Sequence, residues 1–289
     1  MCSNMGGRAA IPAAAPAAQV VAPAAAAQQA APAAPAPARA SGLVSDTGIQ
    51  DMDDATLTAL LRQARSAPRA TDGRDDTMAQ RIADALGITQ NLPESVPQEA
   101  LAQYRSQRGA NGLMYRTVND GSGKTARQIA HELTNHTGNY GWNYGGGRAY
   151  GTGLYFAAQG SGSTPGESAM HSAGSYGWNN PYTIEARLKP TARIATDSDL
   201  RSAAGRAWAK AHVGALRSIG LRVDTSGNVH DASGSWRSTD IDTTIAMLRG
   251  YDGYKESSST SVYHTIFNLG ALQVARGNKY DRARRGQLT

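Results

Sequence analysis

The first forty residues limit what the chain can fold into, because they offer almost nothing from which a core can be built. Met1 to Ala40 contain 19 alanines and 6 of the 12 prolines, and their two charged residues are Arg8 and Arg39. Such a segment buries too little apolar surface to offset the entropy of ordering it, and repeated proline interrupts a continuous helix. We therefore expect residues 1–45 to form a disordered arm, and the fold to begin after them.

The same arm bears on targeting. Pro12, Pro16 and Pro23 interrupt its apolar stretches, so the compact hydrophobic core of a secretory signal peptide is missing. Cys2 has no apolar stretch before it, unlike a lipidated cysteine. Nothing in the sequence approaches the roughly 20 apolar residues that a membrane span needs. The sequence predicts neither secretion by a signal peptide nor membrane insertion.

The cysteine count and the charge distribution limit which metal sites and binding sites the chain can form. A single cysteine excludes an intrachain disulfide, and no Cys/His cluster has zinc spacing, so no metal site is predicted. The formal net charge is +6, and a basic tail, residues 276–289, concentrates it, with five basic residues between Arg276 and Arg285 against one acid, Asp281. This tail is either a contact for nucleic acid or an acidic partner, or simply a solvated terminus.

Residues 46–110 predict a small helical segment. The pairs Asp53-Asp54 and Asp75-Asp76 each precede a helical pattern of apolar residues and can supply its N-cap. The first helix should end before Pro68 and the second at Gly87. Nothing in this segment suggests chemistry.

From Gly112 onward the pattern changes, and residues 111–275 predict a separate domain. Strands are expected at 113–118, 153–157 and 182–188, helices at 125–133 and 199–219, and a β-rich run at 262–272. Helix and strand alternate irregularly and are joined by long connections rich in Gly, Asn and Ser. This arrangement favours an α+β fold over a doubly wound parallel sheet.

Two glycine-rich stretches resemble nucleotide-binding loops, but the residues around each do not complete the motif. Gly121 to Thr125 ends like a phosphate-binding loop, but the position five residues before Gly123 holds Val118 instead of glycine. We interpret it as a turn that caps the next helix. Gly145 to Gly153 lacks the buried strand before it and the helix after it that a dinucleotide fold requires.

Three ordered blocks carry the specific signal. The first is the apolar strand at 113–118, which has one arginine near its end. The second is Tyr150-Gly-Thr-Gly-Leu-Tyr-Phe-Ala157, followed by 169–176 and 184–190. The third is Gly250-Tyr-Asp-Gly-Tyr254, followed by 262–268. In this order and spacing, residues 112–274 resemble the ADP-ribosyltransferase superfamily, especially its divergent members in phage and mobile-element proteins.

The resemblance implies a split β-sheet core with flanking helices, and NAD as substrate. It implies an enzyme that cleaves nicotinamide from NAD and transfers ADP-ribose to a protein or other acceptor. It also implies a phage protein that acts on a host target, in the host cytoplasm or carried in the virion.

Several residues match the family's NAD-binding positions. Arg116 matches the arginine that grips the phosphate and ribose side, a task that suits a bidentate guanidinium. Gly151 and Gly153 would let the backbone approach the nicotinamide amide. An ordinary edge-strand arginine is the alternative for Arg116.

Three aromatic residues complete the predicted cofactor site. Tyr155, with Phe156 beside it, would offer a ring on which nicotinamide stacks. Tyr176 matches the aromatic residue that packs on the other side of nicotinamide. Core packing is the alternative for all three.

The catalytic glutamate is the point where the sequence departs from the family. The family's glutamate falls at or near Tyr263, and the nearest carboxylate is Glu256, which we expect in the Ser-rich loop that includes 257–261. A phenol cannot replace an acceptor-only carboxylate. Either Glu256 swings in from this loop, with Arg116 as the other catalytic residue, or the activity is weak or lost. A virion structural or interaction protein that keeps the fold without activity is the alternative, and a nucleic-acid-associated protein is a third.

Overall fold

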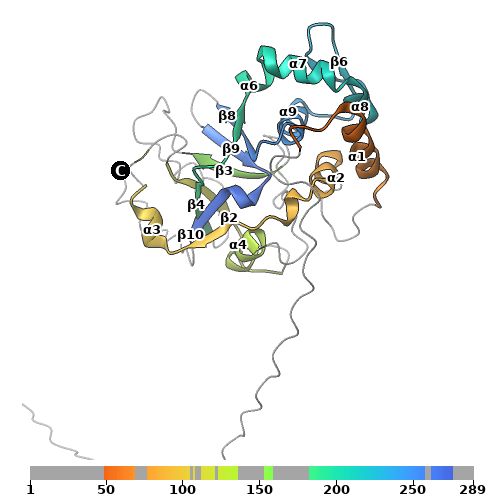
Figure 1. The fold of residues 1–289 in the computed structure, drawn as a ribbon. Coiled ribbons are helices and arrows are strands. Elements are labelled where there is room, and N and C mark those ends of the chain that lie inside the picture. Colours follow the sequence, from red (N-terminus) through yellow and green to blue (C-terminus); the bar gives the residue numbers. More distant parts are fainter. Residues whose placement is uncertain are drawn as a thin grey trace, which may run out of the picture. The chain divides into compact units, whose positions relative to one another are not determined.

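The computed structural model describes residues 49–68, 77–104, 107, 112–120, 123–135, 153–158, 182–257 and 262–275 (Figure 1). All of them belong to one unit of the chain, Ala40–Thr289. Strand β1 (Glu94–Val96), from the segment 46–110, pairs with a strand of the segment 111–275. The predicted arm, 1–45, and the basic tail, 276–289, lie outside the described residues.

An eight-stranded sheet forms the centre of the described part. The central strands pair antiparallel, whereas the outermost strand at each edge pairs parallel to its neighbour. With several helices around a mostly antiparallel sheet, the predicted α+β class is confirmed. The strands, in order across the sheet, are β1 (Glu94–Val96), β10 (Leu272–Ala275), β4 (Tyr182–Leu188), β2 (Met114–Val118), β3 (Leu154–Ala158), β9 (Val262–Ile266), β8 (Gly253–Ser257) and β5 (Ile194–Thr196).

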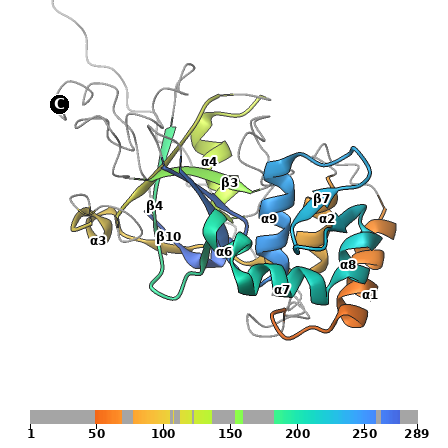
Figure 2. The ribbon, with the colours of Figure 1, turned by 90° about the horizontal axis from the view of Figure 1, so that it is seen from above.

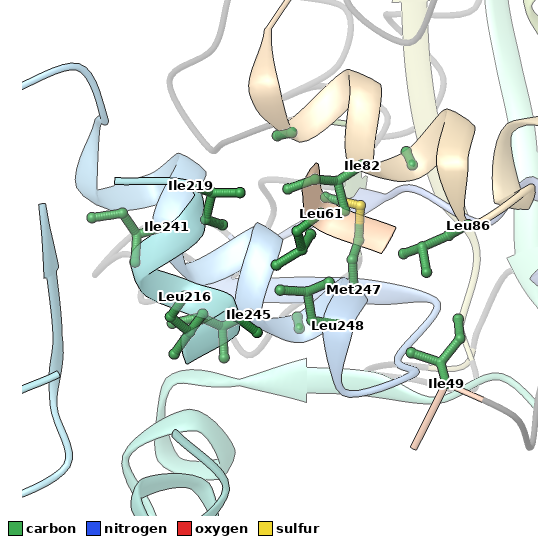
Figure 3. Close-up of a cluster of buried hydrophobic side chains, with 14 of the residues drawn as sticks. Ile49, Leu61, Ile82, Leu86, Leu216, Ile219, Ile241, Ile245, Met247 and Leu248 are labelled. Carbon is green, nitrogen blue, oxygen red and sulfur yellow. The ribbon is translucent and has the colours of Figure 1, made fainter. Parts of the chain in front are cut away.

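A helical layer packs at the β5–β8 end of the sheet. The layer consists of α1 (Asp54–Ser66), α2 (Met78–Ala85), α6 (Asp197–Arg201), α7 (Ala203–Ala211), α8 (Val213–Ser218), α9 (Ser238–Leu248), the 3-10 turn η1 (Ile88–Gln90) and the hairpin of β6 (Leu221–Val223) and β7 (Val229–Asp231). Figure 2 shows α1, α2, α7, α8 and α9 grouped on one side of the sheet. The core of this layer is apolar, and Leu61, Ile82, Leu216 and Met247 meet there from four different helices (Figure 3).

The helix caps follow the sequence in part. Asp53 accepts a hydrogen bond from the Thr56 amide at 2.7 Å and starts α1, as predicted. The N-cap of α2 is Thr77 and not an aspartate at 75 or 76, because the Thr77 hydroxyl accepts from the Gln80 amide. Gly87 follows α2 with a φ of 72°, in the left-handed conformation that glycine favours.

The long helix predicted at 199–219 is wrong. The chain forms α6, α7 and α8 instead, with breaks at Ser202 and His212. The Ser202 hydroxyl accepts from the Gly205 amide at 3.0 Å and starts a new helix. A serine that satisfies free amides at a helix start competes with continuation of the previous helix.

Helix α9 was not predicted from the sequence. Ile241, Thr243, Ala246 and Met247 are all buried, and together they surround much of the helix. A helix buried on several sides lacks the single apolar stripe by which an amphipathic helix is identified.

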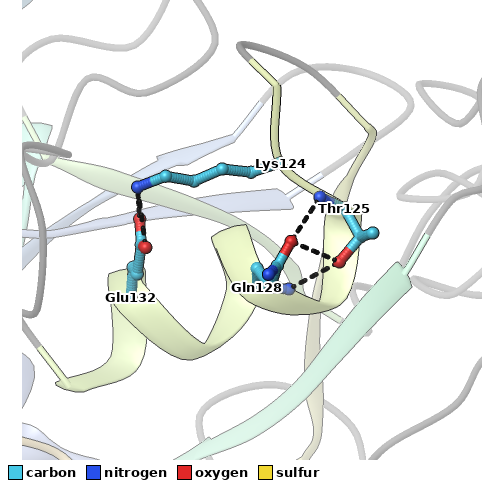
Figure 4. Close-up of polar contacts among 4 residues, drawn as sticks. All are labelled: Lys124, Thr125, Gln128 and Glu132. Carbon is cyan, nitrogen blue, oxygen red and sulfur yellow. Dashed lines mark hydrogen bonds and ion pairs between the residues drawn. The ribbon is translucent and has the colours of Figure 1, made fainter.

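Helix α4 (Ala126–Asn135) begins at the glycine-rich turn (Figure 4). The Thr125 amide donates to Gln128 Oε1 at 2.9 Å, and the Gln128 amide donates back to Thr125 Oγ1 at 3.2 Å. Lys124 pairs with Glu132 at 2.7 Å rather than pointing at an open loop. These contacts confirm the capping turn. The Lys124 ammonium forms an ion pair with the helix that follows it.

Candidate active face

The fold brings the three sequence blocks side by side. Strand β2, the first block, lies between β3 and β4, which both belong to the second block. Strand β9, from the third block, pairs with β3, and β8 pairs with β9. Residues far apart in sequence thus meet on neighbouring strands in the middle of the sheet.

One face of these strands is apolar. Met114, Phe156 and Ile184 are buried there against Ile129 of α4. Several polar residues also lie on this face, among them Arg116 and His264. Directly paired residues share a face, and Phe156 pairs with His264, so His264 lies here; Arg116 lies here because it pairs with Ile184. We name this the apolar face.

The opposite face carries hydroxyl, phenol and carboxylate groups. The register places Tyr115 opposite Glu185, and Glu256 opposite Tyr263. The Thr117 and Thr183 hydroxyls lie 2.9 Å apart on the same face. We name this the polar face, and its polar members are Tyr115, Thr117, Tyr155, Thr183, Glu185, Tyr254, Glu256, Tyr263 and Thr265.

Arg116 and Glu256 do not meet. Arg116 belongs to the apolar face and Glu256 to the polar face, so the structure does not assemble them into one catalytic pair. The half-buried guanidinium of Arg116 donates through Nη1 to the Tyr155 carbonyl oxygen at 3.1 Å. Burial lowers the pKa of Arg116 to about 10, so it stays charged at neutral pH.

The other predicted cofactor residues separate in the same way. Phe156 is 1% exposed and belongs to the core, so it offers no accessible ring, contrary to expectation. Tyr155 is half-buried on the polar face. Gly153, at φ 146°, is close to β9: an added Cβ would lie 2.8 Å from Thr265 Cγ2 and 2.9 Å from the Ile266 oxygen. This close approach explains the glycine without any ligand. Gly151 and Tyr176 lie outside the described residues.

Glu256 lies within β8, opposite Tyr263, and not in the Ser-rich loop where it was expected. Pairing with β9 extends the strand to Ser257. One carboxylate oxygen, Oε2, is buried without a hydrogen-bond partner among the described residues. Burial, and then the nearby Asp197 carboxylate, raise the pKa of Glu256. A buried carboxylate oxygen without a hydrogen-bond partner lowers the stability of a folded protein. Its presence therefore points to a donor that is supplied from outside the described residues.

Two carboxylates that the sequence did not single out, Asp197 and Asp242, lie near Glu256, and Arg201 lies near both of them. Asp197 begins α6 directly after β5, and Asp242 lies on α9, which packs against β8. Arg201 pairs with Asp197 and lies 3.9 Å from Asp242. Burial, aided by the charges of Asp197 and Glu256 against that of Arg201, raises the pKa of Asp242 to about 6. No sequence pattern links positions 197, 242 and 256, because they come from three separate elements.

The third block also contains a structural clasp. Asn268 donates to Asp252 Oδ1 at 2.6 Å, and the Arg193 amide donates to Asp252 Oδ2 at 2.8 Å. Asn91 donates in turn to Asn268 Oδ1 at 3.0 Å. Asp252 and Asn268 therefore hold the ends of β8 and β9 in place rather than facing the polar face.

Comparison with known proteins identified no similar protein. No protein-family model, no curated protein and no solved structure matches this chain. In the described part, no helix has both the length and the apolar character to cross a bilayer. Nor do the described residues contain a cluster of three or more His, Cys, Asp or Glu side chains suited to a metal ion.

Proposed function

We propose that the polar face binds NAD and that the protein is an ADP-ribosyltransferase that uses Glu256 as its catalytic carboxylate. The observation that carries the proposal is the buried Glu256 Oε2, which has no hydrogen-bond partner among the described residues and shares its face with Tyr155. A ribose hydroxyl of NAD would supply the missing donor.

The reaction makes specific demands on these residues. The bond between ribose C1′ and the nicotinamide nitrogen breaks, its electron pair leaves with nicotinamide, and positive charge develops on the ribose. A nucleophile of the acceptor then adds to C1′ and loses its proton. An ionised Glu256 would stabilise the ribose charge, and its raised pKa makes it a stronger hydrogen-bond acceptor. The half-buried Tyr155 ring would lie against nicotinamide.

Arg116 has a different part in this proposal from the one that the family resemblance gives it. From the apolar face its guanidinium reaches the Tyr155 carbonyl, so it would hold β3 and the Tyr155 ring in place. The phosphates of NAD would then require another cation.

The second candidate function is a virion structural or interaction protein that keeps the fold without the activity. Two observations favour it. A tyrosine, Tyr263, stands where the family places its glutamate, and Glu256 does not share a face with Arg116. The family assignment, the phage origin and the acceptor belong to the proposal in either form.

Release of nicotinamide from labelled NAD tests the proposal. Glu256→Gln should lower the rate by roughly a hundredfold or more, as the loss of one charge-stabilising group does, with little change in NAD affinity. Lys255→Gln is the matched control, because it neutralises the preceding residue of β8 on the other face, and its rate should change less than about threefold.

The remaining outcomes separate the two candidates. A Glu256→Gln protein that retains full activity would overturn the catalytic assignment. A wild-type protein that releases no nicotinamide above background would instead support the inactive fold. In that case Tyr263→Glu, which puts a carboxylate at the family's position, tests whether the activity can be restored.

A further inference from the structure

Four exposed arginines gather at one end of the helical layer. They are Arg62 and Arg65 of α1, Arg217 of α8 and Arg222 of β6. Arg65 donates through Nη1 to the Ser218 carbonyl oxygen at 3.0 Å, which places the last turn of α1 beside the last turn of α8. Figure 2 shows these two helices side by side. We name these four residues the arginine patch.

The four arginines of the patch outnumber the two carboxylates of the neighbouring hairpin, Asp224 and Asp231. None of the four arginines forms an ion pair with a described carboxylate. Asp231 accepts hydrogen bonds from the amides of Ser233 and Trp236, and Asp224 accepts one from the Asn228 amide. These bonds lower the pKa of both carboxyls and keep them ionised, so they offset part of the charge of the four arginines but not all of it. The patch therefore presents net positive charge to a partner.

A recess of about 440 Å³ opens next to the patch. Arg65 belongs to both, and the other walls include Thr77, Ser235 and Trp236, with the buried Asp240 also lining it. Trp236 is half-buried, and its indole Nε1 donates to the Ile219 oxygen at 3.0 Å, which fixes the plane of the ring. The volume lies in the range of ligand pockets, and an indole wall with hydroxyl neighbours suits a flat heterocycle.

We propose that the arginine patch and the recess together bind a single-stranded nucleic acid. The guanidinium groups contact successive phosphates, and one base enters the recess against the Trp236 ring. Stacking on an aromatic ring requires an unpaired base, which a duplex does not offer. Phosphate contact by arginine accounts for affinity without sequence preference. This site lies in the helical layer and is independent of the proposed NAD chemistry.

Fluorescence anisotropy with the full chain tests the proposal, using a labelled 20-nucleotide oligothymidylate and a duplex of the same length. We expect the single strand to bind at least fivefold more tightly than the duplex. The double variant Arg217→Glu/Arg222→Glu should weaken single-strand binding tenfold or more. It should also lower the slope of log affinity against log salt by roughly 1.4, or about 0.7 for each lost phosphate contact.

Arg127→Glu is the matched control, since Arg127 is an exposed arginine of α4, outside the helical layer. It should change affinity less than twofold. Trp236→Phe checks the recess by a second measurement: the oligonucleotide should quench tryptophan fluorescence in the wild type and do so less in the variant.

Three results would overturn the proposal. One is the absence of binding at about 50 mM salt, where phosphate contacts are strongest. The second is an equal loss of affinity in the Arg127→Glu control. The third is equally tight binding of polyglutamate, which would show that charge alone is recognised.

Discussion

The two faces of the central strands have the same backbone and opposite chemistry. On the apolar face, Met114, Phe156 and Ile184 pack under α4 and complete a core. On the polar face, Thr117, Tyr155 and Glu256 occupy the alternate positions of neighbouring strands. A sheet face that only packs against a helix to form a core can carry apolar side chains at every buried position. Polar groups retained on the other face carry a cost in stability, which a ligand site would explain.

The comparison also divides the residues that were predicted from the family resemblance. Arg116 and Phe156 match the resemblance in sequence, yet both lie on the apolar face, whereas Tyr155 and Glu256 lie on the polar one. If the division is functional, substitutions on the apolar face should affect stability, and those on the polar face should affect NAD.

The largest expected effect is that of Phe156→Ala on the apolar face. Removing this fully buried ring should lower the free energy of unfolding by about 3–5 kcal/mol, because the cavity cannot collapse within the sheet. Urea denaturation measures the change. Phe156→Leu, which keeps most of the volume, should cost less than about 1.5 kcal/mol. A small loss in the alanine variant would mean that the ring is not part of the core.

Arg116→Ala tests the boundary between the two faces. Loss of the donor to the Tyr155 carbonyl should cost about 1–3 kcal/mol in unfolding free energy. The NAD affinity of the folded protein, measured by calorimetry, should remain within about threefold of wild type, because a group that only positions β3 contributes no direct NAD contact and so far less than the 1.4 kcal/mol of a tenfold change. Loss of NAD binding in the folded variant would instead restore Arg116 as the phosphate anchor and move the site to the apolar face.

Two buried groups should give opposite pH dependences of stability. His264, on the apolar face, lies 2.8 Å from Met114 Sδ, and burial lowers its pKa to about 4. The unfolded chain then binds the proton more readily, so stability falls as the pH drops from about 6.5 to 4. Asp242, near Glu256, has a pKa raised to about 6, so the folded state binds the proton more readily and stability falls as the pH rises from about 4 to 6.

Variants separate the two contributions. Asp242→Asn should remove the fall between about pH 4 and 6 and stabilise the protein at pH 7 by roughly 1–2 kcal/mol. His264→Gln should remove the fall in stability between about pH 6.5 and 4. Thermal melting across the pH range measures both, and the exposed Asp51→Asn is the control for the removal of one negative charge. An unchanged pH profile in Asp242→Asn would contradict the assignment.

The smallest expected effect comes from the turn that starts α4, the cover of the apolar face. Thr125→Ala removes the hydroxyl that accepts from the Gln128 amide and should cost about 1 kcal/mol. Thr125→Ser keeps the cap and should cost less. If both variants cost the same, the cap contributes nothing and α4 is held by its apolar residues alone.

Local patterns in the sequence determined several elements. The strand at 182–188 and the turn at Thr125 were predicted from alternation and from capping residues within a few positions. The start of α1 at Asp53 likewise follows from one side chain and the amides next to it. Such interactions span three or four residues, so their outcome is contained in the local sequence.

Tertiary structure alone decided the site. Side chains alternate along a strand, so a shift of one residue in pairing moves a group to the opposite face, and this register placed Arg116 and Glu256 on different faces. The surroundings of Glu256 depend on Asp197 and Asp242, which reach it from α6 and α9. Helix α9 itself was hidden because packing on several sides removes the apolar stripe. Register and long-range packing are set by the whole fold, and no window of sequence contains them.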